Sequence, residues 1–151
     1  MSLETIDRCR PVIEAVVPQV DGGRFPIKRT VGERVVVDAD CFVDGHDALG
    51  CAVRYRLDGD SQWREAPMTF LGNDRWRGEF RTEACGRYLY TVQAWVEHFA
   101  SWRRDFIKRV EAEQDLSVAL QMGGDLVEQA AGRAAGEEAR SLADWAARLA
   151  G

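Results

Sequence analysis

Apolar and polar side chains alternate along much of the first hundred residues, with the period of two that predicts β-strands. The clearest case is CAVRYRLD (51–58), in which every second residue from Cys51 is apolar and the residues between them include arginines. Such a pattern is typical of an antiparallel strand with one face buried and one face in water. The expected buried residues are Cys51, Val53, Tyr55 and Leu57.

Further strands are expected over 34–43, 63–71, 75–81 and 87–97, with turn residues between them. Pro67 interrupts the second of these and predicts an edge strand or a bulge, because proline cannot donate to a ladder. Tyr88 follows a glycine corner, as the tyrosine corner of sandwich domains does. The remaining inward-facing residues are expected to be Val35, Val37, Ala39, Cys41, Val43, Trp76, Phe80, Tyr88, Tyr90, Val92, Ala94 and Val96.

The segment 102–110 is compatible with a strand or with the start of a helix, and we favour a strand because Phe106, Lys108 and Val110 alternate with Ile107 and Arg109. About seven strands at spacings of roughly 8–12 residues then indicate an immunoglobulin-like antiparallel β-sandwich.

The pattern changes near residue 111, where strand signals stop and alanine becomes frequent. Asp115 is the expected N-cap of a first helix that extends to about residue 131, and a second helix is expected over 136–149. Gly123 and Gly124 predict a kink or break in the first helix, since each glycine costs about 1 kcal/mol relative to alanine. The predicted fold is therefore mainly β with α: an immunoglobulin-like sandwich over 11–110 and a short helical segment over 112–151.

Composition narrows the function classes. The chain has 151 residues and a net charge of −5, which argues against nucleic-acid binding because that needs a basic surface. It contains no apolar run long enough to cross a membrane and no apolar core of the secretory kind at its start. The cysteines at 9, 41, 51 and 85 form no C-x-x-C pair. We expect a cytoplasmic protein in which Cys41 and Cys51 are small buried apolar residues.

Candidate chemistry is sparse. The acidic cluster at 38–47, with His46, does not match the calcium-loop template and reads as a polar strand followed by a turn. His46 and His98 are not placed by the sequence beside a nucleophile, and Gly22-Gly23 lacks the phosphate-loop pattern. We therefore expect no catalytic residue, no metal and no cofactor. Trp95 lies on the face opposite Tyr88, where it would contribute to an interface or to a glucan-stacking surface.

The opening motif is more specific. The block VPQVDGGRFPIKRTVGE (17–33), followed by DGHD (44–47), resembles the N-terminal region of the bacterial α-1,4-glucan:maltose-1-phosphate maltosyltransferases, members of the α-amylase superfamily. NDRWRGEF (73–80), GRYLYTVQAW (86–95) and SWRRDFIKRV (101–110) follow in the order found in that family. The resemblance covers residues 11–131.

The resemblance implies an N-terminal β-sandwich with a helical insert, then a catalytic (β/α)₈ barrel and a C-terminal β-domain. It implies transfer of maltosyl units from maltose 1-phosphate to α-1,4-glucan with retention, and a homodimer built in part by the sandwich and insert. A barrel needs about 250 residues, so the catalytic carboxylates of a retaining mechanism are not expected here. We expect a fragment of the larger enzyme, with a stand-alone relative lacking the barrel as the alternative.

The basic segment then has an expected role at an interface. Its cations and aromatic ring are suited to contact the catalytic domain of the parent chain or a dimer partner, with an ordinary solvated connector as the alternative. The expected contact residues are Arg24, Phe25, Pro26, Lys28 and Arg29. The leading function is a non-catalytic accessory and dimerisation domain; a glucan-binding module and an independent enzyme are the other two readings.

Overall fold

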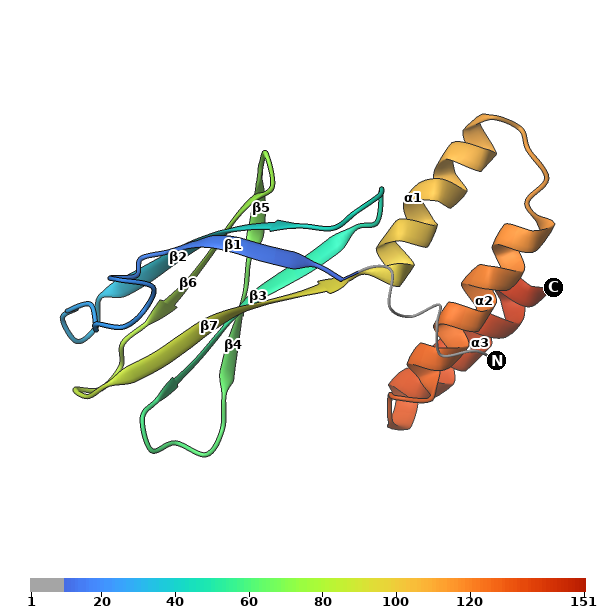
Figure 1. Ribbon diagram of the computed structural model, residues 1–151. Coiled ribbons are helices and arrows are strands. Elements are labelled where there is room, and N and C mark those ends of the chain that lie inside the picture. The colour runs from blue at the N-terminus through green and yellow to red at the C-terminus, as the bar shows by residue number, and fades with distance from the viewer. Residues whose placement is uncertain (1–9) are drawn as a thin grey trace. The chain divides into compact units, whose positions relative to one another are not determined.

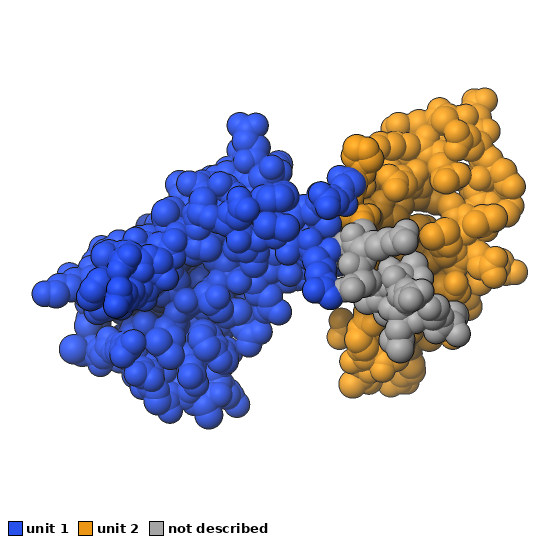
Figure 2. All heavy atoms as spheres, in the orientation of Figure 1, with its two compact units in different colours: residues 1–45, 49–96 blue, residues 46–48, 97–151 orange. Residues whose placement is uncertain are grey.

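The computed structural model describes residues 10–151, which form two compact units. The first unit contains residues 10–45 and 49–96, and the second contains residues 46–48 and 97–151 (Figure 2). Strands lie in the first unit and helices in the second (Figure 1). Cys9 lies outside the described residues. None of the helices in the described part of the chain is both long and apolar enough to span a membrane.

The first unit consists of two antiparallel sheets. One sheet has the order β1 (Val12–Val17), β2 (Arg34–Phe42), β6 (Arg75–Arg81) and β5 (Thr69–Gly72). The other has the order β4 (Arg64–Pro67), β3 (Leu49–Leu57) and β7 (Tyr88–Val96). Together with three helices, these sheets confirm a fold that is mainly β with α.

The predicted buried faces of the main strands form the core of this unit. On β2 the side chains that were expected to point inward are 0–3% exposed, whereas the residues between them are half-buried or exposed. Phe80 of β6 joins the two sheets, because its ring stacks on Tyr55 of β3 with centroids 4.3 Å apart and contacts Tyr90 of β7 at 5.8 Å. The core residues are Val35, Val37, Ala39, Cys41, Cys51, Val53, Met68, Phe80 and Val92.

Two details of the strand prediction differ from the observed strands. The expected strand 63–71 is divided into β4 and β5, which belong to different sheets. The division occurs after Pro67, where Met68 turns into the core. Gly78 of β6 makes room for it, since a Cβ there would lie 2.8 Å from Met68 and from Val53. In addition, β1 was not expected, because its residues do not alternate.

The strand predicted over 102–110 is wrong, because this segment belongs to helix α1 (His98–Glu111). The aromatic residues of α1 recur at helical spacing and pack along one side. Trp102 stacks on Phe106 with centroids 5.2 Å apart and contacts Phe99 at 5.3 Å. Buried Ser101 fixes the start of the helix, since its hydroxyl accepts a hydrogen bond from the Ala48 N–H at 2.8 Å.

The two later helices are confirmed as α2 (Ser117–Ala131) and α3 (Gly136–Ala150). The break predicted at Gly123-Gly124 does not occur, because α2 is one continuous helix. Both glycines are buried and serve close packing instead. A Cβ on Gly123 would lie 2.2 Å from the Trp102 ring, and a Cβ on Gly124 would lie 3.3 Å from the Ala146 carbonyl of α3.

Candidate functional site

The basic loop, residues 20–29, projects from the first unit as a tight turn. The N–H groups of Gly23 and Phe25 both donate to the Val20 carbonyl, at 3.1 and 3.3 Å. Asp21, Gly22 and Gly23 all have positive φ values, between 50° and 85°, which favours glycine at two of the three positions. The two glycines that looked irregular in the sequence are therefore required by the shape of the turn.

Both ends of the loop are tied to the sheets. On the N-terminal side, the Tyr90 hydroxyl donates to the Pro18 carbonyl. Burial raises the pKa of the Tyr90 hydroxyl, an effect that the nearby Arg29 guanidinium opposes. On the C-terminal side, buried Thr82 donates from its hydroxyl to the Thr30 carbonyl at 2.8 Å. The loop is thus held in place although its tip is exposed.

The tip presents an aromatic ring and cations to solvent. Phe25 is 54% exposed, and the Arg24 guanidinium lies 6.0 Å from its ring centroid. Arg24 also approaches the Asp21 carboxylate at 3.6 Å, and Arg29 approaches Glu33 at 3.7 Å. These exposed pairs contribute little to stability, which leaves the cations available to an additional anionic group.

A groove with a volume of about 1000 Å³ runs beside the loop. The loop residues Arg24, Phe25, Pro26 and Arg29 line it, whereas Lys28 is not among its lining residues. The other lining residues include Gly86 to Val92, Ile13 and Val16, together with the buried core residues Val35 and Phe80. Sequence reasoning missed this groove because its walls come from segments that are distant along the chain.

Trp95 lies elsewhere. It sits on β7 opposite Gly50 of β3, on the face that points away from the core, and it is 36% exposed. It does not line the groove beside the basic loop. The structure therefore does not bring Trp95 together with the loop residues in one groove.

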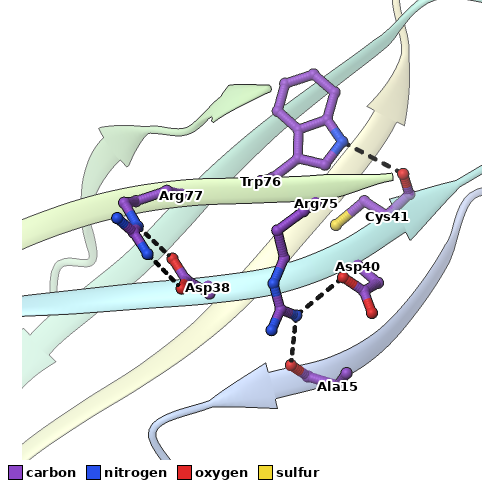
Figure 3. A network of polar contacts seen from close by, with 7 residues as sticks. All are labelled: Ala15, Asp38, Asp40, Cys41, Arg75, Trp76 and Arg77. Carbon is purple, nitrogen blue, oxygen red and sulfur yellow. Dashed lines mark hydrogen bonds and ion pairs between the residues drawn. The ribbon is translucent and has the colours of Figure 1, made fainter. Parts of the chain in front are cut away.

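The first part of the acidic cluster is engaged by arginines across the sheet (Figure 3). Asp38 accepts two hydrogen bonds from Arg77, at 2.7 and 2.8 Å, and Arg77 faces it directly on β6. These bonds lower the pKa of the Asp38 carboxyl. Arg75 joins three strands, because one of its nitrogens donates to Asp40 at 2.9 Å and to the Ala15 carbonyl at 3.4 Å. Asp38 and Asp40 therefore act as structural partners in the sheet.

The two buried cysteines behave as core residues, as the sequence predicted. Cys41 is 1% exposed and Cys51 is 4% exposed. Burial raises the pKa of both thiols, and that of Cys51 is raised far above its ordinary value. A thiol held protonated in this way is a poor nucleophile.

The second unit has a smaller groove, of about 470 Å³, between α1 and α2. Trp102, Phe106 and Met122 line it, and Trp102 Nε1 donates to the Ala119 carbonyl at 2.7 Å within the same region. Val118, which also lines it, is 69% exposed. The sequence signal for this groove is the helical spacing of Phe99, Trp102 and Phe106. The alternation of residues 106–110, which favours a strand, hides this signal.

Comparison with known proteins places the chain in a family. The family model described as "Alpha-1,4-glucan:maltose-1-phosphate maltosyltransferase, domain N/S" matches residues 9–151. Curated proteins with the name α-1,4-glucan:maltose-1-phosphate maltosyltransferase are similar along most of the chain. The protein of Chlorobaculum tepidum is 47% identical over 135 residues, which cover 89% of this chain and 20% of that protein.

Two further relatives with the same name agree. The Myxococcus xanthus protein is 43% identical over 91% of this chain and 22% of its own length. The Pseudomonas aeruginosa protein is 35% identical over 95% of this chain and 22% of its own length. The chain thus spans about a fifth of the length of these curated relatives. It belongs to the α-1,4-glucan:maltose-1-phosphate maltosyltransferase family, within which it matches domain N/S.

Proposed function

We propose that this chain is a non-catalytic N-terminal accessory part of a longer maltosyltransferase that elongates α-1,4-glucan from maltose 1-phosphate. The observation that carries the proposal is the family match, which assigns nearly the whole chain to domain N/S. A (β/α)₈ barrel takes about 250 residues, which is more than the 151 present. The acid and nucleophile of a retaining transferase would lie on that barrel.

We further propose that the first unit is an immunoglobulin-like sandwich. The sheet orders β1-β2-β6-β5 and β4-β3-β7 correspond to strands A-B-E-D and C′-C-F of that fold. A tyrosine corner supports the assignment, because the Tyr88 hydroxyl accepts from the Glu83 and Ala84 N–H groups at 3.1 Å each.

The two-domain organisation remains part of the proposal. We now draw the boundary at 96–97 rather than 110–112, because α1 groups with the later helices.

The role we propose is scaffolding and dimerisation in the cytoplasm. The basic loop supports this role. Phe25 is 54% exposed and lies on a turn that is fixed at both ends. The neighbouring cations, Arg24 and Arg29, form only exposed ion pairs. Exposed apolar groups flanked by polar ones mark interaction sites. The surface that the loop contacts would belong to the catalytic domain or to the second copy of the longer protein.

A pair of variants tests this role. Phe25→Ser removes the exposed ring of the loop, and Leu71→Ser removes a side chain of similar exposure, 51%, on β5. In the longer protein we expect Phe25→Ser to lower the melting temperature and the dimer fraction in sedimentation velocity, while Leu71→Ser leaves both unchanged. In the isolated 151-residue chain both should unfold at nearly the same temperature as the parent sequence. Equal effects of the two variants in the longer protein would refute the loop's role.

The alternative function is a glucan-binding module, for which the exposure of the Trp95 indole is the supporting feature. Aromatic rings exposed on a sheet can stack on sugar rings, and burial of the ring would change its fluorescence. Titration with maltoheptaose separates the readings. A saturable change that Trp95→Leu abolishes favours the binding module, whereas a flat titration leaves scaffolding.

A further inference from the structure

The sheet formed by β4, β3 and β7 has an outer face that points away from the core. Alternate residues of a strand lie on opposite faces, so the outer residues of β3 are those that alternate with the core residues Cys51 and Val53. Directly opposite residues of paired strands share a face. The outer face therefore contains Gly50, Ala52, Arg54 and Arg56 of β3, Leu89, Thr91, Gln93 and Trp95 of β7, and Glu65 of β4.

Arg56 is held in one orientation by its neighbours. Its guanidinium lies 4.9 Å from the ring centroid of Trp63, and its Nη1 donates to the Asp60 carbonyl at 2.6 Å. Among the described residues, no carboxylate forms an ion pair with Arg56. A guanidinium that is oriented but not neutralised is preorganised for an anion, and its planar fork of donors suits a carboxylate.

Arg54, two residues earlier on β3, also has donors to spare. Its Nη1 donates to the Gln93 side-chain oxygen at 3.1 Å. The Glu65 carboxylate lies 4.0 Å from its Nε, which is too far for a hydrogen bond. The Nε of Arg54 and that of Arg56 are buried and have no hydrogen-bond partner within the described chain. Because a guanidinium has five N–H donors, most donors of the arginine pair are not used by these neighbours.

Two tryptophans flank the arginine pair. Trp63 is 38% exposed and Trp95 is 36% exposed. Trp95 lies directly opposite Gly50, which has no side chain to cover the indole. Tryptophan and arginine are the residue types in which the binding energy of protein interfaces concentrates. Neither groove described above is lined by these four side chains, and small ligands prefer concave pockets, so the face is suited to another protein surface.

We propose that the outer face of β4, β3 and β7 docks against a carboxylate-bearing surface of the longer maltosyltransferase, from outside these 151 residues. The proposal rests on the proposed function. About four-fifths of the length of the curated relatives lies outside the matched part, so the longer chain can supply this surface. Within the paired parts of the three strands, two arginines on this face outnumber the one carboxylate, Glu65. Charge complementarity therefore selects an acidic partner surface.

The face also restricts the chemistry of its partner. Because the Arg56 guanidinium lies over the Trp63 ring, a carboxylate would approach the edge of the guanidinium and accept two hydrogen bonds from it. Apolar groups of the partner would cover the indoles of Trp63 and Trp95. The contact should weaken as the salt concentration rises, because salt screens the attraction between the charges.

Hydroxyl-radical footprinting with mass spectrometry tests the proposal, because the oxidation rate of a side chain follows its exposure. In the isolated chain, Trp63 and Trp95 should be oxidised at similar rates. In the longer protein, Trp63 should react about fivefold more slowly, as its exposure falls from 38% to a value like the 8% of Val92 in the core. Phe70 on β5, which is 54% exposed, should react equally fast in both proteins. Unchanged rates for both tryptophans in the longer protein would refute the docking.

Two variants and a salt series test the role of charge. In the longer protein, Arg56→Glu should raise the oxidation rate of Trp63 to that of the same variant in the isolated chain, because it would place two carboxylates in contact. Arg81→Glu, on β6 in the other sheet, should leave Trp63 protected. A salt series needs no variant: from about 0.1 M to about 1 M the screening length falls from about 10 Å to about 3 Å, and Trp63 should react faster in the longer protein alone. Protection that survives both Arg56→Glu and high salt would refute the acidic partner.

Other occupants give different outcomes. Oxidation of Trp63 and Trp95 that slows as the concentration of the isolated chain rises, together with a dimer in sedimentation, would assign the face to a second copy. Slower oxidation when maltoheptaose is added to the isolated chain would assign it to a glucan. Either result overturns the proposal.

An activity measurement separates this inference from the proposed function. A longer protein that releases phosphate from maltose 1-phosphate while Trp63 and Trp95 stay fully reactive refutes only the docking face. Turnover by the isolated chain refutes the proposed function, whatever the oxidation rates.

Discussion

Gly123 of α2 is the position where a single methyl group should have the largest effect on the helical unit. In an isolated helix, Gly→Ala stabilises by about 1 kcal/mol. At Gly123 the added Cβ would lie 2.2 Å from Cζ2 and 2.6 Å from Cε2 of Trp102. Carbon atoms in contact lie about 3.5–4.0 Å apart, so the ring or the helix must move by more than about 1 Å.

That movement has two costs. Overpacking in a close-packed region costs about 1–3 kcal/mol. Displacement of the ring also strains the hydrogen bond from Trp102 Nε1 to the Ala119 carbonyl, which is 2.7 Å long and contributes about 0.5–1.5 kcal/mol. Set against the gain in helix propensity, the net effect of Gly123→Ala is a loss of about 1–3 kcal/mol in the free energy of unfolding.

Gly132→Ala is the matched control. Gly132 ends α2 with a φ of −64°, and a Cβ there would meet only carbonyl oxygens at 3.6 and 3.8 Å. Alanine fits this conformation, so the control should be unchanged or stabilised by about 0.4–1 kcal/mol. Urea unfolding followed by far-UV circular dichroism measures both variants. Gly123→Ala that is as stable as the parent chain, or more so, would refute the role of the glycine in packing.

Three further outcomes are expected in the isolated chain. Asp38→Asn should lower the free energy of unfolding by about 0.5–1 kcal/mol. Arg77 lowers the pKa of Asp38 in the folded chain. The difference in stability between the variant and the parent chain should therefore be complete above about pH 5 and should vanish as the pH falls through the folded pKa. A difference that persists undiminished at low pH would contradict the ion pair. Tyr88→Phe removes the acceptor of two N–H groups and should cost about 1 kcal/mol in urea unfolding; no loss would count against the corner. A thiol reagent near pH 8 should label exposed Cys85 and spare buried Cys51 until the chain is unfolded; rapid labelling of Cys51 in the folded chain would exclude a protonated core thiol.

The strand faces could be predicted from the sequence where one face is buried and the other solvated. On β2 and β3, alternation alone identified Val37 and Val53, both 0% exposed. The same rule failed at 102–110, since a short apolar run fits both periods. There the stacking of Trp102 on Phe106, four residues apart, decides for the helix.

The wrong prediction at Gly123-Gly124 and the failure to predict the groove have the same cause. Propensity treats Gly123 as a weak point, whereas in the fold it is the surface on which Trp102 rests. The basic loop was identified as a unit, but which of its side chains share a groove depends on walls contributed by Tyr88 to Val92. Contacts between segments distant along the chain cannot be derived from local patterns.

We propose that this chain supports a longer maltosyltransferase and does not itself carry the catalytic site. The most direct test is phosphate release from maltose 1-phosphate with glycogen as acceptor, measured for the purified 151-residue chain beside the longer protein. We expect release by the longer protein and none above background by the chain alone. Sustained release by the chain alone would refute the proposed function.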